Sequence, residues 1–235
     1  MSAKPHKLYP HGEFRSLAPN LWIVRGGLPF PIYRNMVVYR LPDGRLILHS
    51  LVALDEAGMK QLETLGKPSL MVVPHGYDGM DAHWYFERYP QATFLTPDEE
   101  RPRIEECGVK ISDDPARVLP SFGVKLHKVV GLKFTEYVLE APVDGGTALI
   151  CNSVLAHAGA APSGFIGSLM DVMTMTGGKL APGRMLRAFM VKDKATFKRF
   201  LATLPTIPNI KIVTVSHGDP IVGGDITAKL KAVSA

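Results

Sequence analysis

The sequence predicts an α+β fold in which two β-sheets pack face to face and helices cover their outer faces. Three observations lead to this prediction. Strand-like and helix-like segments alternate along the chain, without an internal repeat or a low-complexity tract. Each half has a hairpin signal, Asp-Gly at 43–44 and Asp-Gly-Gly at 144–146, and each half continues into helices. A sheet with one apolar face has to bury that face, and two such sheets bury each other.

The first half supplies the elements of one sheet and its helices. The predicted strands are 21–25, 35–41, 45–49, 70–74 and 93–96, and the predicted helices are 55–65, 81–89 and a helical turn over 97–108. Apolar residues in 55–65 recur at helical spacing, and Pro90 ends the helix at 81–89. The run at 70–74 is a buried type of strand because its residues before Pro74 are all apolar.

The second half supplies a second sheet in the same order. The predicted strands are 123–130, 136–141, 147–152 and 211–215, and the predicted helices are 192–204 and 225–233. Residues 158–185 are rich in Gly, Pro, Met and small residues. This composition predicts either a mobile loop that covers a site or a weakly helical connector.

Composition and charge narrow the function classes. The chain of 235 residues is 46% hydrophobic and 21% charged, as in an ordinary globular protein. No apolar run reaches the roughly 18–20 residues that span a bilayer, and residues 1–17 lack the apolar core of a signal peptide. Two distant cysteines without a metal or disulfide motif predict a reducing, cytoplasmic location. The net charge of +5 comes from scattered Lys and Arg, which argues against nucleic-acid binding.

The stretch 69–90 holds the densest set of residues that can bind a metal or transfer a proton. His75, Tyr77, Asp78, Asp81 and His83 lie within nine positions, directly after the strand at 70–74. The end of a strand fixes such a loop while its side chains remain exposed, so open sheets carry their chemistry at these places. The sequence therefore predicts a functional site here.

The order of elements resembles the metallo-β-lactamase superfamily from about residue 17 to residue 218. The segment LAPNLWIVRG looks like the first strand of that family, and 69–90 stands where the family has its HxHxDH metal motif. Residues 147–155 stand where the family has a strand ending in a bridging aspartate, and 213–219 where a strand ends in its last metal histidine. The resemblance implies a four-layer αββα sandwich of two mixed sheets, formed by residues 1–235 as a single domain, with its site at one edge between the sheets.

Most of the metal-ligand positions of that family hold other residues in this chain. His75 matches the first histidine of the motif and His217 the last metal histidine. Within the motif, Tyr77 replaces the second histidine, Gly79 the aspartate and Met80 the third histidine. Further along the chain, Leu132 replaces another histidine and Asn152 the bridging aspartate. The chain therefore resembles a divergent member with a degenerate metal-binding motif.

The candidate site residues each have a structural alternative. The predicted metal ligands are His75, Asp78, His83 and His217; Asp78 is also the predicted catalytic acid–base group, and Tyr77 and Asn152 are predicted to bind substrate. His75 can instead be a satisfied structural histidine, His217 a turn residue, and His83 a surface residue bonded to a backbone carbonyl. Either Asp78 or Asp81 can be the N-cap of the helix at 81–89. Asn152 can hydrogen-bond a loop in place of binding a metal.

Two functions of different classes follow. The first is a hydrolase of an ester, lactone, thioester or phosphoester, with an atypical, mononuclear site for one divalent metal such as zinc, iron or manganese. The second is a non-catalytic protein of the same fold that has lost its metals and binds a small molecule or a protein partner through Tyr77, Trp84, Tyr85 and residues 170–175. The expected partner is a small-molecule substrate or ligand, and binding to nucleic acid or to a membrane is not expected. The sequence does not fix the oligomeric state, and a homodimer is one alternative.

Overall fold

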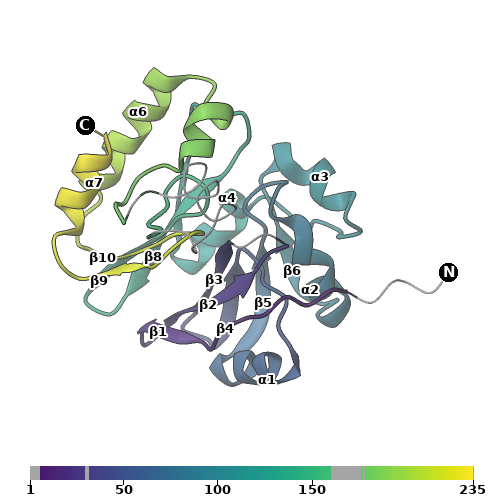
Figure 1. Cartoon of the computed structure of the whole chain (residues 1–235). Helices are drawn as coiled ribbons and strands as arrows, with labels where there is room; N and C mark the ends of the chain where they lie inside the picture. The colour runs from purple at the N-terminus through teal and green to yellow at the C-terminus, as the bar shows by residue number, and fades with distance from the viewer. Residues whose placement is uncertain (1–5, 30–31, 160–175, 177, 235) are drawn as a thin grey trace.

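The structure, a computed structural model, describes residues 6–29, 32–159, 176 and 178–234, which form two mixed β-sheets (Figure 1). The order in the first sheet is β1 (Arg15–Ala18), β2 (Leu21–Gly27), β3 (Tyr33–Arg40), β4 (Arg45–His49), β5 (Lys67–Val72) and β6 (Thr93–Leu95). The order in the second is β11 (Ile221–Val222), β10 (Ile210–Thr214), β9 (Gly146–Ile150), β8 (Tyr137–Val143) and β7 (Lys125–Lys128). The pairs β4–β5, β5–β6 and β9–β10 are parallel, and the others are antiparallel.

Helices flank the two sheets. The α-helices are α1 (Glu56–Leu65), α2 (Ala82–Arg88), α3 (Arg101–Glu105), α4 (Pro115–Val118), α6 (Lys194–Thr203) and α7 (Ile226–Ser234). The 3₁₀ turns are η1 (Gly79–Asp81), η2 (Asp98–Glu100), η3 (Leu119–Phe122) and η5 (Leu204–Thr206), and η4 (Leu186–Met190) is a π-helical turn. Among the described residues, no helix is long and apolar enough to cross a membrane.

Three apolar cores divide the molecule into four layers. Along β3, Met36 and Val38 pack with α1 and α2, whereas Val37 and Tyr39 pack against the second sheet. This split follows from the alternation of side chains along a strand. A third core joins the other face of the second sheet to α6 and α7. The order helices, sheet, sheet, helices confirms the predicted αββα sandwich.

Most predicted elements are confirmed to within a few residues. The hairpin of β3 and β4 turns at residues 43–44 and that of β8 and β9 at 144–145, as the Asp-Gly signals predict. Among the strands and α-helices, three short ones, β1, β11 and α4, were not predicted. Each has at most four residues, which is too short to show a period of its own.

The carboxyl ends of the parallel strands meet at the edge where the sequence predicts the site. Because β4 and β5 run in the same direction, residues 49–50 and 75–78 follow them at one end of the first sheet. In the same way, residues 152–153 and 215–218 follow the parallel strands β9 and β10 of the second sheet. The two ends meet through Asn35 of β3, whose Nδ2 donates to Val215 O at 2.8 Å and to Gly218 O at 2.7 Å.

Candidate functional site

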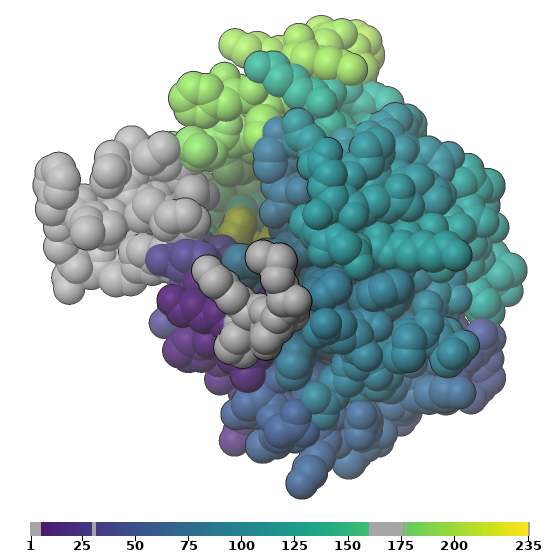
Figure 2. Space-filling view, turned by 90° about the vertical axis from the view of Figure 1, so that its right-hand side faces the viewer, coloured from purple at the N-terminus to yellow at the C-terminus, as the bar shows by residue number. Residues whose placement is uncertain are grey.

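A buried polar cluster lies at this edge, between the ends of the two sheets. The edge cluster consists of His49, Ser50, His75, Asp78, Glu136, Asn152 and Ser153. His49, His75, Glu136 and Asn152 are at most 4% exposed, so most of the cluster is shielded from water. Figure 2 shows a hollow in one face of the molecule, bordered by purple, teal and green parts, with atoms toward the yellow end of the sequence on its floor.

The side-chain amide of Asn152 lies between His75 and Asp78. Asn152 Nδ2 donates a hydrogen bond to Asp78 Oδ2 at 2.6 Å and lies 3.0 Å from His75 Nε2. His75 Nε2 and Asp78 Oδ2 are themselves 4.0 Å apart. Asn152 Oδ1 is buried and has no hydrogen-bond partner among the described residues. A hydrogen-bond donor of the protein therefore lies beside two of the predicted metal ligands.

The hydrogen bonds of His75 fix its tautomer. The backbone N–H of Tyr77 donates to His75 Nδ1 at 3.2 Å, so the ring proton of the neutral form lies on Nε2. Nε2 lies 2.5 Å from Ser153 Oγ and donates to it. A serine nucleophile needs the opposite arrangement, in which an unprotonated nitrogen takes the hydroxyl proton. In this geometry His75 does not activate Ser153.

Glu136 hydrogen-bonds the backbone of the turn that contains Asn152 and Ser153. Its carboxylate is fully buried and accepts the backbone N–H groups of Ser153 at 3.2 Å and Val154 at 2.8 Å. Burial raises the pKa of Glu136, and the nearby His75, 3.7 Å away, partly offsets that effect. Glu136 thus fixes the main chain at the end of β9.

Asp78 is the ionised group of the edge cluster. Burial by itself raises the pKa of this carboxyl, but the charges of His75 and Arg34 and the hydrogen bond from Asn152 outweigh burial. The net pKa lies below the usual range of an aspartate. The Asp78 side chain is 14% exposed, so this negative charge borders on solvent.

His49 and Ser50, at the end of β4, complete the edge cluster. Burial, the largest effect, lowers the pKa of His49 to about 4, so this imidazole is neutral at neutral pH. Among the described residues, His49 Nε2 has no hydrogen-bond partner. Ser50 has a φ of +61°, an uncommon value for a residue other than glycine, and its Oγ donates to Asp78 at 3.3 Å. Such backbone strain concentrates at functional sites.

The other predicted site residues lie around the edge cluster or away from it. His217 donates from Nδ1 to Tyr33 O at 2.8 Å and is near enough to lower the pKa of Asp78. Tyr77 is 55% exposed, and the Arg103 guanidinium lies 4.8 Å from its ring centre. His83 projects from α2 to Gly108 O, 3.2 Å away, and no contact joins it to the edge cluster in the part of the chain that the structure describes.

The capping interpretation of Asp78 and Asp81 is wrong, since neither side chain makes a cap hydrogen bond. Asp81 instead holds three distant parts of the chain together. It pairs with the buried Arg34 of β3, accepts the Ala53 N–H at 2.8 Å and accepts a hydrogen bond from His6 at 2.9 Å. Asp81 is 4% exposed and Arg34 is 3% exposed, so this is a buried ion pair. Its partners satisfy the carboxylate, which leaves the helix start uncapped.

The residues present at the edge do not fit a two-metal centre. Among the described residues, no group of three or more His, Cys, Asp or Glu is arranged to hold a metal ion. A zinc site needs three or four such ligands at about 2.0–2.2 Å from the ion. An amide N–H₂ group is a hydrogen-bond donor and cannot coordinate a cation. An ion shared by His75 Nε2 and Asp78 Oδ2, which are 4.0 Å apart, would lie close to the line between them, and Asn152 Nδ2 beside that line would present an N–H group to it in place of a ligand atom.

Solved structures of known enzymes share the architecture. The mono-zinc form of the metallo-β-lactamase FIM-1 from Pseudomonas aeruginosa is similar with a TM-score of 0.62 and 14% identity, over 99% of this chain and 97% of that one. The chain has the metallo-β-lactamase fold. A metallo-β-lactamase from Erythrobacter litoralis has a TM-score of 0.60 and 16% identity, over 94% of this chain and 95% of that one. The metallo-β-lactamase DIM-1 has a TM-score of 0.62 and 10% identity, over 96% and 98%.

The sequence itself has diverged far from known proteins of the metallo-β-lactamase fold. No protein-family model matches it, and no curated protein is significantly similar to it. Identities of 10–16% to the solved structures establish the fold and leave substrate and metal content undetermined. The function of this chain has to be argued from its own side chains.

Sequence reasoning missed Ser50, Glu136 and Ser153. Two of them carry a signal that was available, because Ser50 and Ser153 follow β4 and β9 just as His75 follows β5. Glu136, at the start of β8, looks like any strand-end glutamate in the sequence. The predicted cover of the site, 158–185, lies largely outside the described residues, as do residues 170–175.

Proposed function

We propose that this protein is a metallo-β-lactamase-fold protein that works without a metal centre and binds a small polar molecule at the edge cluster. The observation that carries the proposal is the position of Asn152 Nδ2, 3.0 Å from His75 Nε2 and 2.6 Å from Asp78 Oδ2. Two common hydrolytic mechanisms, one with a two-metal centre and one with a serine nucleophile, lack the groups that they need at the edge cluster. The ligand set does not fit two metals, and the His75 tautomer does not activate Ser153.

Unsatisfied polar groups in the edge cluster support a binding role. Asn152 Oδ1 and His49 Nε2 are buried without partners among the described residues. Native proteins seldom leave such groups unpaired, because each costs about 1–3 kcal/mol.

The charge of Asp78 disfavours an anionic ligand at the edge cluster. Asp78 is ionised and borders on solvent, so it repels a carboxylate or phosphate that approaches. A neutral hydroxyl or amide group can hydrogen-bond Asn152 Oδ1 or His49 Nε2, the buried atoms without partners among the described residues, without that repulsion. Tyr77, which is exposed and lies 5.8 Å from the His75 ring, offers an aromatic surface beside such a ligand.

A second candidate is a mononuclear metal-dependent hydrolase, as the resemblance implies. The observation in its favour is the 4.0 Å separation of His75 Nε2 and Asp78 Oδ2, which one ion could bridge if the Asn152 side chain turned away. One solved structure of similar fold is described as a mono-zinc form. In this candidate, His217 would have to give up its hydrogen bond to Tyr33 O to become a third ligand.

Metal titration calorimetry separates the two candidates. Wild-type protein purified without chelator or affinity-tag nickel is titrated with zinc, manganese or ferrous iron, beside the variants His75→Ala and Asn152→Asp. The metal-free account predicts no binding by the wild type and a gain of binding by Asn152→Asp, whose new carboxylate would face His75 and Asp78. Tight binding of one ion by the wild type that His75→Ala abolishes, together with hydrolysis of simple ester or lactone substrates, would establish the hydrolase instead.

A further inference from the structure

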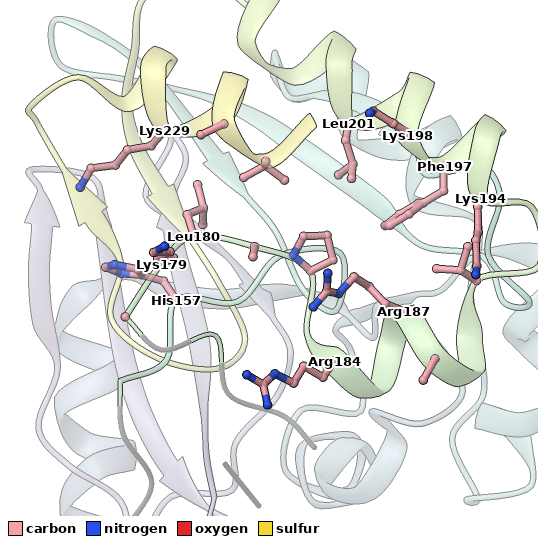
Figure 3. Close-up of a pocket in the computed structure, with 17 residues that line it drawn as sticks. His157, Lys179, Leu180, Arg184, Arg187, Lys194, Phe197, Lys198, Leu201 and Lys229 are labelled. Carbon is pink, nitrogen blue, oxygen red and sulfur yellow. The ribbon is translucent and has the colours of Figure 1, made fainter. Parts of the chain in front are cut away.

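A cavity of about 940 Å³ lies on the outer side of the second sheet, away from the edge cluster (Figure 3). Its walls come from α6, α7, the π-helical turn η4 and residues 178–184, with His157 at its border. Small-molecule sites commonly measure about 300–1,000 Å³. Among its 17 described lining residues none belongs to the edge cluster, so the cavity is a separate candidate site.

The cavity is strongly cationic. Its described lining includes six basic side chains, Lys179, Arg184, Arg187, Lys194, Lys198 and Lys229, and no Asp or Glu. Figure 3 shows these side chains contributed from several segments around the cavity. Within the described part of the chain, Arg184, Arg187 and Lys229 have no carboxylate partner. Uncompensated positive charge in a concave site attracts anions.

The nearby carboxylates are engaged elsewhere. Asp193 caps α6 by accepting the Thr196 N–H at 2.9 Å. Asp225, just before α7, accepts the Ala228 N–H at 2.8 Å. Neither residue is part of the cavity lining. Among the described residues, neither carboxylate pairs with Arg184, Arg187 or Lys229, whose charges remain available to a ligand.

The rest of the lining is mainly apolar. Leu180, Phe197 and Leu201 are buried in the core between the second sheet and the outer helices, and each also borders the cavity. On α6, the lining residues fall at positions 194, 197, 198 and 201, so a single helix face alternates cationic and apolar side chains. The cavity thus offers an apolar floor beneath charged groups.

The turn η4 adds a second unusual feature beside the cavity. It is a π-helix, a rare conformation that frequently marks functional sites. On the same turn as the lining residue Arg187, the side chain of Phe189 is 61% exposed, and the preceding Met185 is 38% exposed. Apolar side chains of this size at the surface favour contact with an apolar partner.

We propose that this cavity binds a single-chain amphiphile with an anionic head, of the long-chain carboxylate class. The basic side chains would hold the head, and the floor formed by Leu180, Phe197 and Leu201 would cover the alkyl chain. An inorganic anion alone would make no contact with the apolar lining, and a neutral lipid would leave the basic groups unused. The basic side chains and the apolar floor of the cavity together match a ligand that has both an anionic head and an alkyl chain.

Calorimetry with octanoate, decanoate and dodecanoate, below their micelle concentrations, tests the proposal on the full chain. Affinity should rise about fourfold for each added methylene that the cavity buries, until the floor is covered. The double variant Arg184→Gln/Arg187→Gln should weaken binding about tenfold or more. Ala188→Trp, a change at an exposed lining position, should block the cavity, whereas Lys60→Gln on α1 should bind as the wild type does.

Four results would overturn the proposal. They are binding of dodecyltrimethylammonium as tight as that of dodecanoate, an affinity that does not change with chain length, retention of full affinity by Arg184→Gln/Arg187→Gln, and binding to anionic phospholipid vesicles without binding to free dodecanoate. Inorganic phosphate is the probe for the head group alone. A fifth result, phosphate affinity equal to that of dodecanoate, would also overturn the proposal, because the apolar floor would then take no part in binding.

Discussion

Asn152 Nδ2 donates a 2.6 Å hydrogen bond to Asp78 Oδ2, and this bond joins the end of β9 in one sheet to the loop after β5 in the other. The two residues are 74 positions apart in the sequence. The bond places a neutral donor beside an ionised carboxylate at the edge between the sheets. This donor adds to the charges of His75 and Arg34 in lowering the pKa of Asp78.

Exchange of this donor for an acceptor should destabilise the protein. Asn152→Asp would place a second carboxylate oxygen about 2.6 Å from Asp78 Oδ2. Like charges at that distance, together with the lost hydrogen bond, should lower the free energy of unfolding by about 2 kcal/mol or more at neutral pH. Urea unfolding measures the loss, which should shrink at acidic pH as one carboxyl takes up a proton. Wild-type stability at neutral pH would contradict the account of this bond.

His49 should make stability depend on pH. Its folded pKa of about 4 lies below the ordinary value of 6.5, so the unfolded chain binds more protons between these two values. The contribution of His49 is therefore present above about pH 6.5 and is lost as the pH falls toward about 4. Between about pH 7 and about pH 5, the loss should be about 2 kcal/mol.

The variant His49→Gln isolates this effect from other titrating groups. Since glutamine does not titrate, the variant should be less destabilised relative to wild type at about pH 5 than at about pH 7, by about 2 kcal/mol. Parallel urea unfolding curves at both pH values provide the comparison. A difference between the two proteins that stays constant with pH would show that His49 is protonated alike in the folded and unfolded states.

Substitution of Asp81 should lower the free energy of unfolding strongly, although this residue lies close to the edge cluster. Asp81→Asn leaves Arg34 buried without its charge partner and weakens the bond to Ala53 N–H. The loss of one partner of a buried ion pair costs about 3–5 kcal/mol. Glu87→Gln is the matched control, because Glu87 is 59% exposed beside His83 and its loss should cost under about 1 kcal/mol. Equal thermal stability of the two variants would refute the anchoring role of Asp81.

Two glycines with similar backbone angles offer a test of the His217 loop. Gly218 has a φ of +99° and Gly123 a φ of +77°, so alanine is strained at both. A Cβ at Gly218 would lie 2.1 Å from His157 O, whereas a Cβ at Gly123 would meet nothing within 4 Å. Gly123→Ala should therefore cost about 1 kcal/mol and Gly218→Ala clearly more. Similar unfolding midpoints for the two variants would show that the 215–218 loop can move away from His157.

The fold was predictable from the sequence because the turn and helix signals along the chain agree with the order of elements in the family that it resembles. Asp-Gly turns mark both hairpins, and apolar spacing marks α1 and α6, which lie on the outer faces. The helix α4 also carried a signal, since Asp114 caps it by accepting the Ala116 N–H at 2.7 Å and Pro115 follows as its first residue. Four residues, however, are too few for a periodic pattern to single out.

The position of the edge cluster was predictable from the sequence, but its contacts were not. The strand-end rule picks out His75 and Asp78, and the resemblance picks out Asn152, as candidates that the structure brings together. No local pattern shows that Asp81 pairs with Arg34, because the two residues are 47 positions apart. Likewise, the amide orientation of Asn152 follows from the ionised Asp78 across the sheet interface. Contacts of this kind depend on the packing of the two sheets, which sequence spacing does not describe.

The most direct test of the metal-free account is the metal content of the protein as it is made in the cell. Elemental mass spectrometry on untagged protein, purified without chelators, measures zinc, manganese and iron per chain. The account predicts well under one ion per chain, at a level that His75→Ala does not change. A content near one ion per chain in the wild type that falls with His75→Ala would contradict it.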